Sequence, residues 1–108
     1  MDFRDHTVAE LAAAVRSGAR PALEMTEAAL ERIARLNGSL NAFVAVDEDG
    51  ARAAASVLDR RIAAGEDVGP LAGMPIGVKD LEDAEGFVTT NGSAVHAEDP
   101  PATQDSLL

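Results

Sequence analysis

The stretch GPLAGMPIGVKD, residues 69–80, separates helix-forming sequence before it from loop-forming sequence after it. Its glycines and prolines interrupt a short apolar run, which predicts a strand entered through a kinked, glycine-rich approach. The run ends at Lys79, the only lysine of the chain. The sequence is therefore considered in two parts, the residues before this predicted strand and the residues after it.

Three helices are predicted before this stretch, because apolar side chains recur there at helical spacing. The first begins with Thr7 and Glu10, a capping-box pair that satisfies free backbone amides at a helix start. The third presents a face made mostly of alanine methyl groups, which allows close packing but buries little apolar surface. The expected ranges are Thr7 to Gly18, Pro21 to Asn37–Gly38, and Asp47 to Gly65.

The apolar run Ala42–Val46 lies between the second and third predicted helices and is bounded by turn-forming residues, which predicts a buried strand. The expected order is helix, helix, strand, helix, strand and loop, an α/β pattern. A right-handed crossover through the third helix would join the two strands as one βαβ unit. Because two strands do not make a stable sheet, we expect the N-terminal part of a larger mixed sheet, incomplete on its own.

The length of 108 residues is enough for one domain, and its two parts differ in charge. Residues 1–66 are expected to be mainly helical, and residues 67–108 to hold the lysine-bearing strand and an acidic loop. From Asp80 to Leu108 there are seven acidic residues and no lysine or arginine. The formal net charge of −10 argues against nucleic acid as a partner, because phosphates attract positive charge.

Several other classes of function are excluded by what the sequence lacks. Without cysteine there are no disulfides, thiolate nucleophiles or thiolate zinc sites. The two histidines have no metal-ligand spacing, so neither a metal nor a cofactor is predicted. The N-terminus is acidic where a signal peptide is basic, and no apolar stretch approaches the roughly 20 residues that span a bilayer. We expect a cytoplasmic protein that does not bind membranes.

Lys79 is the candidate catalytic residue. Eight of the nine basic residues are arginines, yet lysine stands at the end of the predicted strand. Lysine differs from arginine because it can lose its proton when it is desolvated, which a general base requires. The alternative is a solvated lysine at a strand end. A phosphate-binding loop is excluded, because Val78 separates the lysine from Gly77 and Asp80 takes the place of the hydroxyl residue.

Hydroxyl side chains follow Lys79 in the sequence, at Thr89, Thr90 and Ser93. They raise the possibility of a hydroxyl nucleophile paired with the lysine, but nothing in the sequence orients one of them. Turn and capping roles are therefore favoured for all three. The tripeptide Asn-Gly-Ser occurs twice, at 37–39 and 91–93, and both copies are interpreted as turns.

The sequence resembles the start of the catalytic region of the amidase signature family. The strongest resemblance is the motif of residues 69–81, continuing through Gly86 to the segment Thr89–Ser93. Weaker correspondence extends to both sides, at residues 29–33, residues 40–43, Pro100, Ala102 and Asp105. Together these positions cover most of the chain, in the same order as in the family.

The resemblance implies an amide hydrolase with a Ser-cisSer-Lys triad on a mixed sheet flanked by helices. By matching position, Lys79 would be the family's lysine, which in its neutral form accepts a proton through a bridging serine. Both family serines and the oxyanion donors belong downstream of the lysine motif, and no residue of this chain matches them. We therefore expect an N-terminal piece of an amidase that is inactive by itself and needs the remainder of the domain or a partner chain.

The substrate expected for the complete enzyme is a small-molecule amide, hydrolysed to an acid and ammonia or an amine. Two alternatives remain open. The first alternative to an amidase piece is a non-catalytic interaction module that docks its alanine-rich helix and exposed sheet edge on a partner chain. The second is a segment of a glutamine-dependent transamidating subunit.

Overall fold

Helix α1 (Val8–Arg16) begins at the capping box that the sequence predicts. In this computed structural model, which describes residues 1–107, the Glu10 amide donates to the Thr7 hydroxyl at 3.2 Å. The Thr7 amide donates in return to the Glu10 carboxylate at 2.8 Å. Hydrogen bonds from the backbone and side chain of Thr7 hold the pKa of Glu10 below its ordinary value. A 3-10 helix, η1 (Phe3–Asp5), precedes this capped start.

Helix α2 (Ala22–Leu40) begins after Pro21, which supplies no side-chain cap. Asp59 of the following helix supplies one instead, because its carboxylate accepts from the amide of Ala22 at 2.6 Å and from that of Leu23 at 3.1 Å. The prediction that this helix ends at a turn of Asn37–Gly38 is wrong. It continues to Leu40 and ends where Asn41 adopts the left-handed conformation, with φ of 50°.

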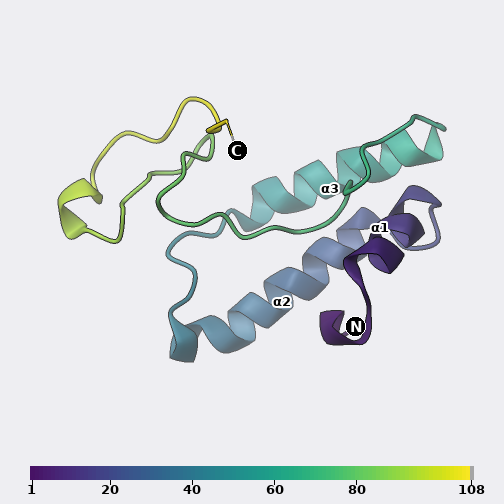
Figure 1. The fold of residues 1–108 in the computed structure, drawn as a ribbon, viewed down its shortest axis with the longest axis horizontal. Coiled ribbons are helices and arrows are strands. Elements are labelled where there is room, and N and C mark those ends of the chain that lie inside the picture. Colours follow the sequence, from purple (N-terminus) through teal and green to yellow (C-terminus); the bar gives the residue numbers. More distant parts are fainter. Residues whose placement is uncertain (108) are drawn as a thin grey trace. The chain divides into compact units, whose positions relative to one another are not determined.

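Helix α3 (Glu48–Ala63) begins where predicted, at Asp47, whose carboxylate accepts from the Gly50 amide at 3.0 Å. α2 and α3 pack against each other and run in opposite directions (Figure 1). Arg52 of α3 donates to Glu27 of α2 at 2.8 Å. This ion pair is exposed, so solvent screens it and apolar packing contributes more to holding the two helices together.

The hydrophobic core is small and lies where the three helices meet. Val15 and Met25 are its largest fully buried side chains. α3 contributes Ala55 alone to the buried cluster, with Leu58 and Ile62 half-buried beside it. The methyl-rich face of α3 therefore packs closely but buries little, as its sequence predicts. The buried cluster consists of Leu11, Val15, Ala22, Met25 and Ala55.

The chain that follows α3 returns to this core, and Gly73 is the point of closest approach. Its φ is +80°, a conformation that residues with a side chain rarely adopt. A Cβ atom at this position would lie 2.6 Å from Val15 Cγ1 and 3.1 Å from Ala22 Cβ. Met74 packs against the same cluster, and Arg16 donates to the carbonyl of Pro70 at 2.5 Å. Glycine is therefore required at 73 for two independent reasons.

The α/β prediction is wrong, because residues 1–107 form three α-helices and two 3-10 helices and no strand. All of Ala42–Val46 is exposed rather than buried. The Asn37 side chain takes up the backbone of Phe43, donating to its carbonyl at 2.9 Å and accepting from its amide at 2.8 Å. The backbone of Phe43 thus forms its hydrogen bonds with the Asn37 side chain, where a sheet would have supplied a neighbouring strand.

The second predicted strand, in residues 69–80, is also absent. Turns occupy residues 70–73, and residues 74–79 after them have no regular secondary structure. Ile76 is 81% exposed and Val78 is 51% exposed. Both side chains lack the second layer that a mixed sheet would place over them.

The chain divides into two compact units, Met1–Pro75 and Ile76–Leu108. The first contains the helices and the core described above. The second is built from turns, and η2 (Ala94–His96) is the one helical element among its described residues. Over residues 1–107, no helix has the length and apolar character needed to cross a membrane.

Candidate functional site

Lys79 lies at the end of the irregular segment of residues 74–79, in the second unit, and it is exposed. The Glu82 amide donates to the Lys79 carbonyl at 3.0 Å, which closes a turn directly after the lysine. Within residues 1–107, no carboxylate lies within 4.0 Å of the Lys79 amine. The backbone at Lys79 is therefore fixed by a turn, while its side chain is held by no ion pair of this part of the chain.

Asp80, the residue after the lysine, holds the later turn that begins at Thr90. Its carboxylate accepts from the Thr90 amide at 2.7 Å and also from the Thr90 hydroxyl. These two bonds, with smaller contributions from the amides of Gly92 and Asn91, hold the pKa of Asp80 below its ordinary value. We call this arrangement of Asp80 with the turn of residues 90–93 the Asp80 clamp.

The other hydroxyl groups after Lys79 also have structural partners. Thr89 donates its hydroxyl proton to Asp83 at 2.6 Å. The Ser93 side chain accepts from the Val95 amide at 3.3 Å and so caps η2. The predicted capping role is confirmed for Ser93, whereas Thr89 and Thr90 donate their hydroxyl protons to the side chains of Asp83 and Asp80. Within residues 1–107, none of the three hydroxyls forms a hydrogen bond with Lys79.

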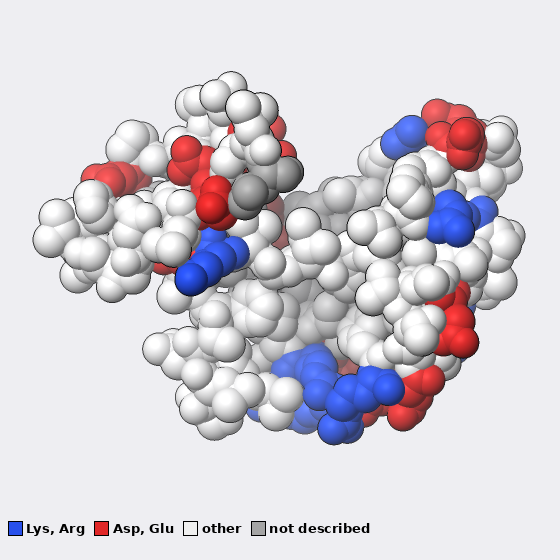
Figure 2. All heavy atoms as spheres, viewed as in Figure 1, with Lys and Arg blue, Asp and Glu red and all other residues white. Residues whose placement is uncertain are grey.

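Acidic side chains hold the rest of the second unit together, where sequence reasoning predicted a solvated acidic loop. Asp105 accepts from the Glu85 amide at 2.8 Å. Ser106 donates its amide to the Asp83 carbonyl at 2.9 Å and its hydroxyl to Glu82 at 3.1 Å. Figure 2 shows acidic side chains spread over the surface of the molecule, including this C-terminal part. The structural roles were missed because each pair is separated by six or more residues, beyond any local turn pattern.

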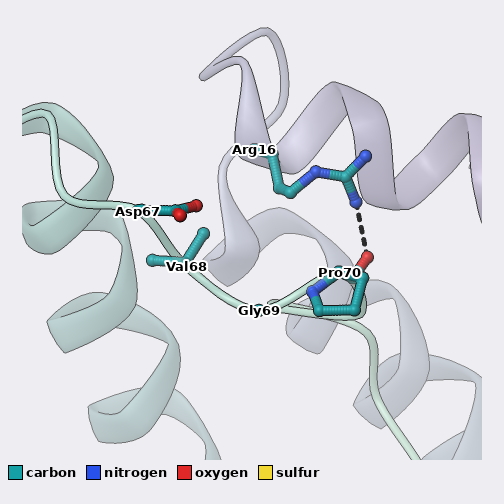
Figure 3. Close-up of a pocket in the computed structure, with 5 residues that line it drawn as sticks. All are labelled: Arg16, Asp67, Val68, Gly69 and Pro70. Carbon is teal, nitrogen blue, oxygen red and sulfur yellow. Dashed lines mark hydrogen bonds between the residues drawn. The ribbon is translucent and has the colours of Figure 1, made fainter.

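A shallow hollow in the first unit is lined by the Arg16 side chain and the segment Asp67–Pro70 (Figure 3). The Arg16 guanidinium points across it to the carbonyl of Pro70. The lining contains no hydroxyl, imidazole or amine, and the Asp67 carboxylate is the one group in it that could act as a base. Over residues 1–107 there is also no cluster of three or more side chains suited to a metal ion.

Comparison with known proteins gives one consistent family. The model of the family described as Amidase matches residues 24–108, which include Lys79 and the Asp80 clamp. The A subunit of glutamyl-tRNA(Gln) amidotransferase from Salinispora tropica is 41% identical over 107 residues, covering 99% of this chain and 22% of the relative. The protein of the same name from Salinispora arenicola is 45% identical over 96 residues, covering 89% of this chain and 20% of the relative.

A solved structure gives the same relationship in three dimensions. It is described as a vestigial protein complex that reveals the evolutionary origins of an s-triazine catabolic enzyme. Its chain matches with a TM-score of 0.87 and 39% identity, over 94% of this chain and 22% of that one. This chain thus spans about a fifth of the length of the relatives that it matches. The match of the family model to residues 24–108 shows that the chain belongs to the amidase family.

Proposed function

We propose that this chain is the lysine-bearing segment of an amidase in which Lys79 acts as the general base. The observation that supports this most strongly is the family match, whose range of residues 24–108 includes the motif at residues 69–81. Lys79 is the single amine-bearing side chain in that match. An arginine could not take this role, because guanidinium does not lose its proton in proteins.

In this mechanism Lys79 moves one proton. A serine hydroxyl attacks the amide carbon, and its proton passes through a second serine to the neutral Lys79 amine. The proton is then returned to the leaving nitrogen, which departs as ammonia or an amine, and water releases the acid from the serine. Both serines and the oxyanion donors would come from polypeptide outside these 108 residues, which we propose to be the remainder of the domain.

Two features of the second unit support this role: the backbone after Lys79 is held in place, and the Lys79 side chain is accessible. The Asp80 clamp and the turn from Lys79 to Glu82 hold the backbone on the C-terminal side of the lysine. The lysine side chain is exposed, so it is accessible to polypeptide that packs on this unit. We propose that such packing removes water from the amine and favours its neutral form.

The test uses a chimera in which this chain replaces the matching first segment of the Salinispora tropica protein. Lys79→Ala and Lys79→Arg are compared with Arg60→Ala, which removes an exposed charge on α3. We expect both lysine variants to lose at least about 100-fold in amide hydrolysis, a typical contribution of acid–base catalysis. Arg60→Ala should retain activity. Turnover by Lys79→Arg at the rate of the parent would overturn the assignment.

A transamidating role is the second candidate, and the names of the curated relatives favour it. Both curated relatives described above carry the name of a glutamyl-tRNA(Gln) amidotransferase component. We propose for this case that the amide is glutamine, that the released ammonia passes to a partner protein, and that the enzyme acts in the cytoplasm. A chimera that releases ammonia from glutamine but not from simple aliphatic or aryl amides would support this candidate over a general amidase.

A further inference from the structure

The tripeptide Asn-Gly-Ser occurs twice in the chain, and the structure places its two copies in opposite environments. One copy, residues 37–39, lies within α2. The other, residues 91–93, lies in an exposed turn of the second unit. Because the three residues are identical, any difference in their chemistry arises from the fold.

The first copy is held in a conformation that prevents reaction between the asparagine side chain and the next amide. Both polar atoms of the Asn37 side chain are engaged with the backbone of Phe43, at 2.8 and 2.9 Å. The backbone carbonyl of Asn37 accepts from the Asn41 amide at 2.7 Å. Gly38 has helical backbone, so its amide takes part in the helical hydrogen-bond pattern.

The second copy lacks the side-chain and helical constraints of the first, although its Gly92 amide faces the Asp80 carboxylate and helps to lower the pKa of that group. Asn91 and Gly92 are both exposed, and the Asn91 side chain makes no hydrogen bond within residues 1–107. Both residues have positive φ, 53° and 69°, and one backbone bond from Ser93 to Thr90 of 2.9 Å closes the turn. No atom lies within 4 Å of the position of a Cβ at Gly92, so there is open space on that side of the turn.

We propose that Asn91 is a site of spontaneous deamidation, while Asn37 is protected by its helix. The backbone nitrogen of Gly92 attacks the side-chain carbonyl carbon of Asn91 and loses its proton to water. The C–N bond of the side-chain amide breaks, ammonia leaves, and a five-membered cyclic imide forms. Water then opens the imide at either carbonyl and gives aspartate or isoaspartate.

The modification acts directly on the Asp80 clamp. It places a new carboxylate in the turn whose Thr90 amide and hydroxyl bind the Asp80 carboxylate. The new carboxylate and that of Asp80 carry like charges and repel each other, and isoaspartate also lengthens the backbone of the turn by one methylene group. We expect the clamp that follows Lys79 to loosen in the modified chain.

The experiment incubates the folded chain at neutral to mildly alkaline pH and follows both sites by tryptic digestion and tandem mass spectrometry. Cleavage after Lys79 and after Arg35 and Arg52 places Asn91 and Asn37 in different peptides. We expect the side-chain amide of Asn91 to be converted to a carboxyl group at least about tenfold faster than that of Asn37, as the peptide masses will show. In the urea-denatured chain the two rates should become equal within about twofold.

Two outcomes would overturn the proposal: equal rates in the folded chain, or an unmodified Asn91 when the denatured chain reacts at both sites. Gly92→Ala should slow the reaction at Asn91, because a methyl group hinders the attacking nitrogen, and should leave Asn37 unchanged. An NMR spectrum of the Asn91→Asp variant should show the Thr90 amide displaced from its position in the parent. An unchanged Thr90 amide would refute the effect on the clamp.

Discussion

Replacing Gly73 by alanine should disrupt the return of the chain to the helical core. The new methyl group has two costs. The backbone must hold an alanine at φ of +80°, which costs roughly 1–2 kcal/mol. The Cβ must also fit 2.6 Å from Val15 Cγ1, where overpacking of a filled core typically costs about 1–3 kcal/mol. The expected loss in the free energy of unfolding is therefore about 2–5 kcal/mol.

Two other glycines separate these costs. Gly65 has φ of +79° with no atom within 4 Å, so Gly65→Ala carries the conformational cost alone. Gly69 has neither a positive φ nor a near neighbour, so Gly69→Ala should be neutral or stabilising by up to about 1 kcal/mol. Urea unfolding followed by circular dichroism measures all three. The expected order of stability is Gly69→Ala, then Gly65→Ala, then Gly73→Ala.

A double-mutant cycle identifies the atom responsible. Val15→Ala removes the γ-methyl group that the new Cβ would strike, so Gly73→Ala should cost less in that background. What remains is the conformational part and the closer contact with Ala22 Cβ. If Gly73→Ala is no more destabilising than Gly65→Ala, or if its cost is unchanged beside Val15→Ala, the close-approach reasoning is refuted.

Two further predictions concern carboxylates with assigned structural roles. Asp59→Ala should lower the melting temperature by several degrees, because α2 loses a cap worth about 1 kcal/mol. Asp49→Ala on the same helix as Asp59 should have a much smaller effect in thermal unfolding, because the Asp49 side chain is fully exposed. Asp80 has a folded pKa below its ordinary value of 3.8, so the clamp is stabilised above that pH and this stabilisation is lost as the pH falls through the depressed value. The Thr90 amide should follow this transition in NMR spectra, and an amide insensitive to acid would contradict the assignment.

Local signals in the sequence predict the helix starts well. Thr7 with Glu10, and Asp47, are bonded to amides within three residues, so their partners are visible in the sequence. The cap of α2 is different, because Asp59 lies 37 residues from Ala22. Only the packing of α3 against α2 brings them together, and no local pattern reports it.

The two strand predictions failed because an apolar run specifies burial only when another segment covers it. Ala42–Val46 has the composition of a strand, but the Asn37 side chain satisfies the backbone of Phe43 and the side chains remain exposed. Ile76 and Val78 are likewise exposed within the chain. The composition of a segment shows that its residues favour a buried strand, but it does not show whether another segment is present to cover their side chains.

The candidate site shows the same division. Lys79 is identified by its chemistry and by the family motif, both of which are visible in the sequence. The Asp80 clamp is not, because the carboxylate of Asp80 and the amide of Thr90 are ten residues apart across an irregular turn. Spacings of this kind have no fixed geometry in loops, so only the folded chain shows which pairs meet.

The capping of α2 by Asp59 also has a consequence for the order in which the helices become stable during synthesis. Pro21 and the start of α2 are synthesised before residue 59, which lies 37 residues after Ala22. Until then the first amides of α2 have only water as a partner, and that end of the helix frays. When α3 forms and packs on α2, Asp59 caps these amides. The N-terminal end of α2 therefore becomes stable only after the later helix is in place.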